Sequence, residues 1–252
     1  MRTSVAFAER LNDATVQKHF HPIEDIDWSV PIDIESEHRY LPEKFISLNG
    51  TALYASMSER EKKLLSLYEA VSYFSTGIWL ENMLMYGFLY KLYAMDYSDP
   101  DTRYMLHEVG EEANHSIMFH EFVRRVGLGY SPARWHNRVL GRIGARQIPT
   151  VNMYLFFIGI LAGEEPPDHF ARAAREDDRV HPLVRRITEI HSIEEARHIA
   201  YAREFLAKRY HEANRFQKLH ARIAAPISVR VVVGEFFTPR WPTGYDQAPA
   251  HL

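Results

Sequence analysis

The chain has 252 residues and a formal net charge of −3 at neutral pH, so it lacks the basic excess of a nucleic-acid or anionic-membrane surface. It contains no cysteine, which excludes disulfides and thiolate metal sites and leaves histidines and carboxylates as the strong metal ligands. Apolar residues make up 46% of the chain, enough for a large buried core. The longest apolar stretch, about residues 151–163, is too short to cross a bilayer, and the N-terminus lacks the apolar core of a signal peptide. We therefore expect a cytoplasmic protein that binds neither nucleic acid nor membrane.

The first half of the chain predicts three helices. A short helix begins after Thr3 or Ser4, and an arm interrupted by prolines follows to about residue 56. Ser58 begins a capping box, and the long helix that it opens runs to about residue 95. Asp99 and Pro100 are an N-cap and first-turn pair, and they predict another long helix that ends near Gly127.

The second half predicts two more long helices. A connection rich in Trp and Arg, residues 131–147, leads into a strongly apolar helix over about residues 150–165, which Pro166 and Pro167 are expected to interrupt. After a polar piece, His181 and Pro182 open a helix to about residue 214. The tail from residue 217 mixes a helix containing Pro226 with a run, residues 227–237, that favours strand. Residues 58–214 thus predict two helical hairpins, which make an all-α four-helix bundle within a single domain, 1–252, with peripheral terminal segments.

Two Glu-x-x-His pairs lie on separate predicted helices: Glu112 with His115, and Glu195 with His198. Residues three and four apart share a helix face, so the members of each pair point the same way, and His191 joins the second pair from one turn earlier. Four-helix bundles present carboxylates and imidazoles in this pattern to two buried iron or manganese ions. A pair of this kind also arises by chance roughly once in a chain of this composition.

A third pair, Glu35 with His38, lies in a polar stretch that contains proline, and we interpret it as a chance occurrence. Glu35 and His38 are therefore not counted among the candidate ligands.

A dinuclear site of this class needs one further Glu from each of the two remaining helices. Glu81 is the candidate in the first helix, because its neighbours one and two turns away are apolar. The third helix offers Glu164 and Glu165. Glu81 precedes Glu112 by 31 positions and Glu164 precedes Glu195 by the same 31, so equal hairpins favour Glu164. Glu165 stays open as the alternative, since Pro166 could distort that turn.

The predicted metal ligands therefore number seven. Carboxylates can bridge two cations, imidazole suits iron, and manganese is compatible with the same donors. His191 would make one ion richer in nitrogen ligands than the other. The full set is Glu81, Glu112, His115, Glu164, His191, Glu195 and His198.

Two segments, residues 106–122 and 178–206, resemble the p-aminobenzoate N-oxygenase family of ferritin-like di-iron proteins, and the resemblance extends over about residues 40–210. That family carries a His-x-x-x-Glu-x-x-His pattern in its fourth helix, matched here by His191, Glu195 and His198. The acid before Glu195 is Glu194, where the family usually has Asp. The resemblance implies two irons, O2 as co-substrate, an amine substrate, an external electron donor, a homodimer and a place in natural-product biosynthesis.

The leading hypothesis is an O2-dependent monooxygenase that oxidises an amine nitrogen toward hydroxylamine, nitroso or nitro products. No catalytic residue beyond the metal ligands is predicted, and no flavin or nicotinamide motif is present, so electrons are expected from outside the chain. The alternatives are a di-iron oxygenase acting on carbon, by C–H hydroxylation or C–C cleavage, and a non-catalytic ferritin-like metal-binding protein.

Overall fold

The computed structural model describes residues 4–240, and the side chains of residues 149–151 lie outside that description. Within the described residues the chain is helical, with no strand beyond one isolated bridge between Arg39 and Val180, so the predicted all-α class is confirmed. No helix in this part of the chain combines the length and the apolar character needed to span a bilayer. The elements are α1 (Val5–Gln17), η1 (Glu43–Phe45), α2 (Ala52–Ser56), α3 (Glu59–Leu92), α4 (Pro100–Val126), α5 (Trp135–Val151), α6 (Met153–Glu176), α7 (Pro182–Arg209) and α8 (Arg215–Phe237).

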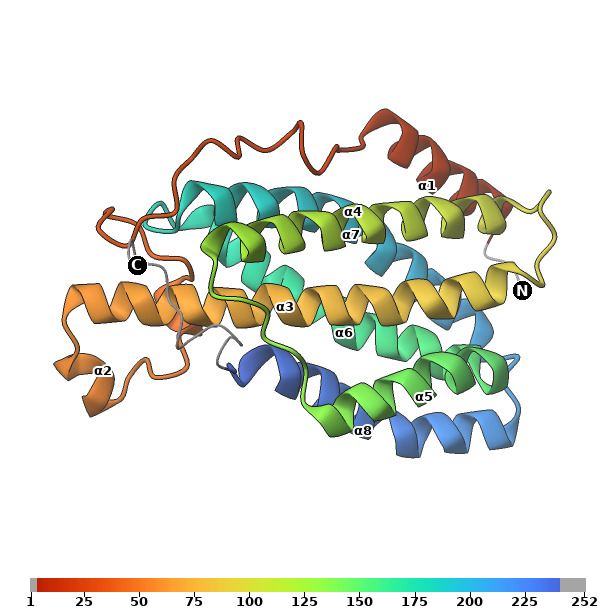
Figure 1. Ribbon diagram of the computed structural model, residues 1–252. Coiled ribbons are helices and arrows are strands. Elements are labelled where there is room, and N and C mark those ends of the chain that lie inside the picture. The colour runs from red at the N-terminus through yellow and green to blue at the C-terminus, as the bar shows by residue number, and fades with distance from the viewer. Residues whose placement is uncertain (1–3, 241–252) are drawn as a thin grey trace.

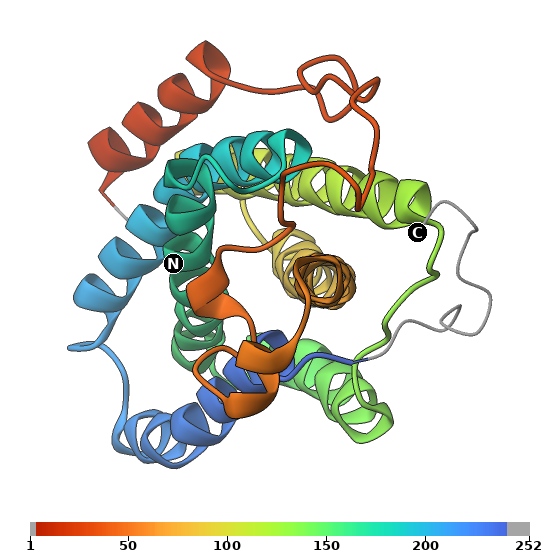
Figure 2. The same ribbon diagram turned by 90° about the vertical axis from the view of Figure 1, so that its left-hand side faces the viewer.

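The four long helices α3, α4, α6 and α7 form the predicted bundle (Figure 1). α3 packs along α4 and α6 packs along α7, and contacts of α4 with α7 and of α3 with α6 close the bundle. Viewed along the bundle, α1 (red) covers one side, against α4 and α7, while α8 (blue) lies on the opposite side (Figure 2). α5 and α8 together cover α3 and α6, so the centre of the bundle is enclosed by helices.

The helix termini follow the capping chemistry expected from the sequence. The Ser58 side chain accepts a hydrogen bond from the backbone N–H of Glu61, whose carboxylate in turn accepts one from the backbone N–H of Ser58. Asp99 caps α4, which carries Pro100 in its first turn and ends at Gly127, whose φ of 76° favours glycine. His181 caps α7 in the same manner, because its ring accepts from the backbone of Leu183. These caps fix where the bundle helices begin, and hence the depth at which their side chains meet.

The predicted interruption at Pro166 and Pro167 is wrong, because α6 continues through both prolines to Glu176. The prolines remove two helical donors, but burial of the following turns against the bundle holds the helix together, with Phe170 completely buried. The Pro167 carbonyl also accepts a hydrogen bond from the Tyr73 hydroxyl, at 3.4 Å. Tertiary packing thus outweighs the local preference of the proline pair.

Two further expectations need correction. The segment expected as a connection, residues 131–147, mostly belongs to α5, and the run expected to favour strand belongs to α8. Gly141 lets α5 approach α3 closely, because a Cβ there would lie 2.9 Å from the Trp79 ring. In α8, Val232 and Phe236 are buried four residues apart, which is helical spacing. Contacts with the bundle therefore decide the conformation of both segments.

A buried charge cluster fixes the end of α8. The Glu235 carboxylate is completely buried and accepts hydrogen bonds from Arg134, Asn137 and Arg240. Arg240 also donates to the Thr76 hydroxyl of α3, at 2.7 Å. Because every charge in this cluster has a partner, it ties α8 and the start of α5 to the bundle. Residues 241–252 of the predicted tail lie outside the described residues.

Candidate metal centre

The seven residues predicted as ligands come together in the middle of the bundle, and we call them the central cluster. α3 supplies Glu81, α4 supplies Glu112 and His115, α6 supplies Glu164, and α7 supplies the remaining three. All seven are buried, and the most exposed of them, His191, is only 5% exposed. Ionisable groups this deep need partners of opposite charge or a metal ion.

The donor atoms of the central cluster lie close enough together to share metal ions. In four overlapping groups made of these residues alone, one ligand atom per residue lies within 4.8 Å of the others. One group joins three carboxylates from three helices, two contain Glu195 beside an imidazole, and one joins Glu81 to two imidazoles. These groups are Glu81–Glu112–Glu164, Glu112–His115–Glu195, Glu164–His191–Glu195 and Glu81–His115–His191.

Glu164 and its neighbour Glu165 have opposite surroundings. Glu164 is 1% exposed and belongs to the central cluster. Glu165 has a side chain that is 43% exposed and forms an ion pair with Arg203 at 2.8 Å. The geometry therefore supports Glu164 over Glu165, the choice that the equal spacing of the two hairpins favoured. Its assignment as a metal ligand stays a prediction.

Two outer carboxylates that sequence reasoning did not include hold the imidazoles of the Glu-x-x-His pairs. Glu194 of α7 lies 2.9 Å from Nε2 of His115 in α4, and Glu111 of α4 lies 2.8 Å from Nε2 of His198 in α7. Each helix thus orients the imidazole of the other. The signal in the sequence was the acid immediately before each motif glutamate, in Glu-Glu-x-x-His.

These outer contacts select which ring nitrogen faces the centre. With Nε2–H donating to the outer carboxylate, Nδ1 of His115 is directed at Glu112 and Glu195, at 3.0 and 3.4 Å. Nδ1 of His198 lies 3.1 Å from Glu112 and 3.2 Å from Glu195. A metal-ligating histidine characteristically donates its other N–H to a carboxylate or carbonyl, and both rings are arranged in this way.

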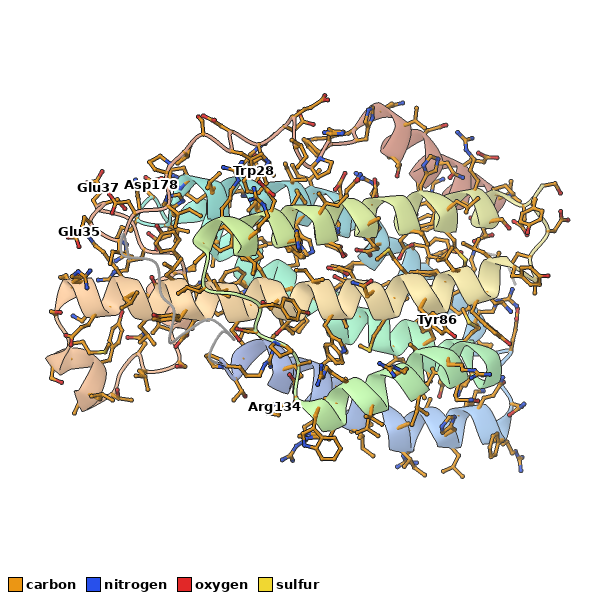
Figure 3. The ribbon with its side chains drawn as sticks, in the orientation of Figure 1. Trp28, Glu35, Glu37, Tyr86, Arg134 and Asp178 are labelled. Atoms are coloured by element: carbon orange, nitrogen blue, oxygen red, sulfur yellow. The ribbon has the colours of Figure 1, made fainter. Side chains whose placement is uncertain are left out.

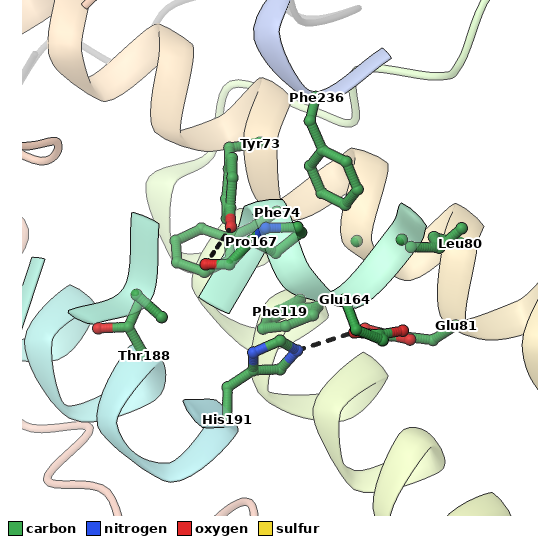
Figure 4. A pocket seen from close by; sticks show the side chains of 13 residues that line it. Tyr73, Phe74, Leu80, Glu81, Phe119, Glu164, Pro167, Thr188, His191 and Phe236 are labelled. Carbon is green, nitrogen blue, oxygen red and sulfur yellow. Dashed lines mark hydrogen bonds and ion pairs between the residues drawn. The ribbon is translucent and has the colours of Figure 1, made fainter. Parts of the chain in front are cut away.

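His191 is oriented differently from the other two histidines. Its Nε2 is 3.5 Å from Glu81 and 3.6 Å from Glu195, and this nitrogen has no hydrogen-bond partner. Figure 4 shows the ring directed toward the carboxylates of Glu81 and Glu164. The ring packs against Phe119 at a tilted angle of 48°, with centroids 5.3 Å apart.

Buried oxygen atoms without hydrogen-bond partners test whether the central cluster suits metal ions. Each of its four carboxylates has one such atom, although Glu112 Oε1 does lie 3.1 Å from His198 Nδ1, and leaving an oxygen unpaired in a dry interior is costly. Four carboxylates also balance the charge of two divalent cations. The donor set therefore fits two ions of the iron or manganese type, which prefer oxygen and imidazole nitrogen. The atoms are Glu81 Oε2, Glu112 Oε1, Glu164 Oε1 and Glu195 Oε2.

Without a cation, the cluster retains protons. Burial alone would lower the pKa of His115, but hydrogen bonds with Glu112 and Glu194 outweigh it and raise the pKa to about 10. Burial, followed by the negative charges of Glu112 and Glu195, raises the pKa of Glu81 well above its usual range. A cation that binds here must displace these protons.

The metal-free protein is therefore expected to lose stability as the pH rises. The contribution of His115 is fully present below 6.5, its ordinary pKa, and is lost as the pH rises through about 10. The raised pKa of Glu81 acts in the same direction, because the fold favours its neutral form. Urea unfolding should give a falling free energy of unfolding over this range, while the affinity for divalent ions rises. Stability that rises with pH in the metal-free protein would contradict this account.

Glu35 and His38 lie outside the site, as expected. Glu35 is exposed, forms an ion pair with Arg60 at 2.9 Å, and is labelled at the periphery of the molecule in Figure 3. His38 is half-buried in the N-terminal arm, outside any helix.

One cavity adjoins the central cluster, and a second, which none of the seven proposed ligands lines, shares only Leu80 with it. The first is only about 10 Å³ and is lined by Glu81, Glu164 and His191 together with aromatic side chains such as Tyr73 and Phe236 (Figure 4). The second, about 230 Å³, lies between α3, α5, α6 and α8 and is lined almost entirely by apolar groups. Leu80 is the one described residue that lines both cavities.

Comparison with known proteins identifies the family. Residues 2–243 match the family described as p-aminobenzoate N-oxygenase AurF. The chain belongs to this family. It is also 31% identical, over 236 residues, to the uncharacterised proteins Mb0909 of Mycobacterium bovis and MT0908 and Rv0885 of two Mycobacterium tuberculosis strains, with 91% of this chain and 68% of each relative covered. The resemblance drawn from the histidine pattern is thus confirmed, and with it the ferritin-like all-α fold. The family suggests a di-iron oxygenase, and the carboxylate and imidazole groups of the central cluster are compatible with metal binding.

Proposed function

We propose that this protein is an O2-dependent non-haem di-iron monooxygenase that oxidises the nitrogen of an amine. The observation that carries the proposal is the central cluster itself, in which seven buried donors from four helices converge and outer carboxylates orient two of the imidazoles. Family membership supports the same chemistry. The seven proposed ligands are Glu81, Glu112, His115, Glu164, His191, Glu195 and His198.

The reaction balances with a two-electron donor from outside the chain. A primary amine, O2, two electrons and two protons give a hydroxylamine and water, so one N–O bond forms while the O–O bond breaks. Two bound irons would supply the redox chemistry that activates O2. The protein holds Nε2–H of His115 and His198 on Glu194 and Glu111, which keeps both Nδ1 atoms available as ligands. Repetition of the oxidation would lead to nitroso and nitro products.

The lining of the larger cavity indicates an apolar substrate. A cavity of roughly 150 Å³ holds a benzene ring, so about 230 Å³ accommodates a ring with small substituents. None of the described residues that line it carries a charge, and Ser228 supplies its one hydroxyl group. A carboxylate placed there would be left unpaired at a cost of a few kcal/mol. We therefore propose a neutral aryl amine, in preference to an aminobenzoate, as the substrate class.

The test of the function uses purified protein loaded with Fe(II) under anaerobic conditions, then exposed to ¹⁸O2, a chemical reductant and 4-ethylaniline. We expect ¹⁸O on the nitrogen of the product, with 4-ethylaniline oxidised at least about tenfold faster than p-aminobenzoate. Label found only on carbon would support the runner-up, a carbon oxygenase. Fe(II) oxidation without any labelled product, in a large multi-subunit shell, would support iron storage.

Leu80 is expected to control passage between the two cavities. Its side chain packs against Gly163, where a Cβ would lie 2.7 Å from Leu80 Cδ2, directly before Glu164. Leu80→Ala should therefore join the cavities and lower the KM for amines larger than 4-ethylaniline several-fold. Leu84→Ala is the matched control, because Leu84 is equally buried and lines only the larger cavity. Equal KM changes in both variants would contradict a separating role for Leu80.

The proposed homodimer has a candidate surface on α5 and α8. Their outer faces carry large apolar side chains that are more than half exposed, which is typical of interaction surfaces. Light scattering of the purified protein should give twice the mass of one chain. Substituting Ile143 and Ile223 with Glu should give the monomer mass. The exposed residues that do not line the larger cavity are Trp135, Ile143, Phe216, Leu219 and Ile223.

A further inference from the structure

The two halves of the bundle carry the same pattern of functional residues, displaced by 83 positions along the sequence. Adding 83 to a residue number takes Glu81 of α3 to Glu164 of α6. In the same way, the Glu-Glu-x-x-His motif of α4 corresponds to that of α7. In full, Glu81, Glu111, Glu112 and His115 correspond to Glu164, Glu194, Glu195 and His198. By the same displacement, His191 corresponds to Glu108, a residue one turn before Glu112.

Glu108 shares the surroundings of the proposed ligands. It is 1% exposed, and its ligand atom lies within 4.8 Å of those of Glu112 and His198. Its Oε2 atom is buried without a hydrogen-bond partner, as are oxygens of the four carboxylates of the central cluster.

The hydroxyl groups near Glu108 do not satisfy it. Tyr104, one turn earlier on the same helix, has a buried hydroxyl without a hydrogen-bond partner. The Tyr201 hydroxyl donates to Asp101 instead, at 2.6 Å. Buried polar groups are normally hydrogen-bonded, and a buried carboxylate oxygen without a partner has lone pairs that a cation could accept. Glu108 therefore has the position and the free oxygen of a ligand.

We propose that Glu108 is an eighth metal ligand, bound to the ion at the end of the cluster opposite His191. This inference rests on the proposed dinuclear centre and goes beyond its seven ligands. One ion then binds the imidazole of His191, and the other binds the carboxylate of Glu108, which occupies the equivalent position in the other hairpin. Because carboxylate oxygen is the harder donor, the ion bound by Glu108 should be the more easily oxidised of the two.

The experiment compares wild-type protein with Glu108→Gln and Glu108→His. Glutamine has the size of a neutral glutamate but a poor ligand oxygen, so the metal-free variant should fold as wild type does. In anaerobic titrations with Co(II) and Fe(II), we expect Glu108→Gln to bind the second ion about tenfold more weakly or worse. Glu108→His should retain two ions, but with a changed Co(II) ligand-field spectrum and one changed iron Mössbauer doublet, because nitrogen replaces oxygen on one ion.

Glu165→Gln, on an exposed glutamate, is the matched control and should bind two ions as wild type does. Wild-type affinity and spectra in both Glu108 variants would overturn this inference while leaving the proposed function intact. A wild-type protein that binds fewer than two ions would overturn the proposed function, and the inference with it. Circular dichroism of the metal-free variants separates loss of a ligand from loss of the fold.

Discussion

Glu164→Ala is expected to remove binding of one metal ion and to lower amine oxidation by at least about two orders of magnitude, whereas Glu165→Ala should leave both unchanged. Glu164 is buried among the donors of the central cluster, and Glu165 reaches solvent and pairs with Arg203. An exposed ion pair contributes at most about 1 kcal/mol to stability, so its loss should be tolerated. The two residues are adjacent in α6, so a difference between the variants reports whether the side chain points into the central cluster or toward solvent.

The measurement is metal content by elemental analysis after anaerobic loading, together with product formation from 4-ethylaniline. The metal-free Glu164→Ala protein should be at least as stable as wild type, because the change removes a buried carboxyl group with an unpaired oxygen. Two tightly bound ions in Glu164→Ala, or loss of one in Glu165→Ala, would show that the ligand had been misassigned.

Glu194→Ala should weaken metal binding by roughly 10–100-fold, although Glu194 belongs to the outer carboxylates. Without this carboxylate, Nε2 of His115 loses its acceptor at 2.9 Å, and the ring can turn or place its proton on Nδ1. Glu204→Ala, on the same helix, is the control, because Glu204 forms an ion pair with Lys208 near the surface and lies outside the central cluster. Competition of the protein with a chelator for Fe(II) measures the effect. Equal affinities in the two variants would mean that the Glu194 contact does not orient the ligand.

Much of the bundle could be predicted because local chemistry specifies it. Capping at Ser58, Asp99 and His181 fixes three helix starts, and the apolar faces of the long helices require burial. The convergence of the seven residues was also predictable, because helical spacing aligns each motif and hairpins of equal length bring Glu81 and Glu164 to matching depths. The family follows from the extra histidine, His191.

The predictions of secondary structure that were wrong concern segments where tertiary contacts override the conformational preference of the local sequence. α6 passes through Pro166 and Pro167 because the turns that follow are buried, and residue preferences alone cannot report this. α8 is helical despite its β-branched run, because Val232 and Phe236 pack on the bundle. Glu108 was missed for a different reason. A single glutamate one turn from a motif carries no signal until the equivalence of the two hairpins is recognised.

The crossed contacts between the outer carboxylates and the imidazoles have a consequence for assembly of the site. Glu111 belongs to the first hairpin and holds a histidine of the second, while Glu194 belongs to the second and holds a histidine of the first. Neither hairpin alone therefore contains both a Glu-x-x-His imidazole and the carboxylate that orients it. Metal capture should await docking of the two hairpins, which would protect a nascent chain from binding redox-active iron before its interior is closed to water.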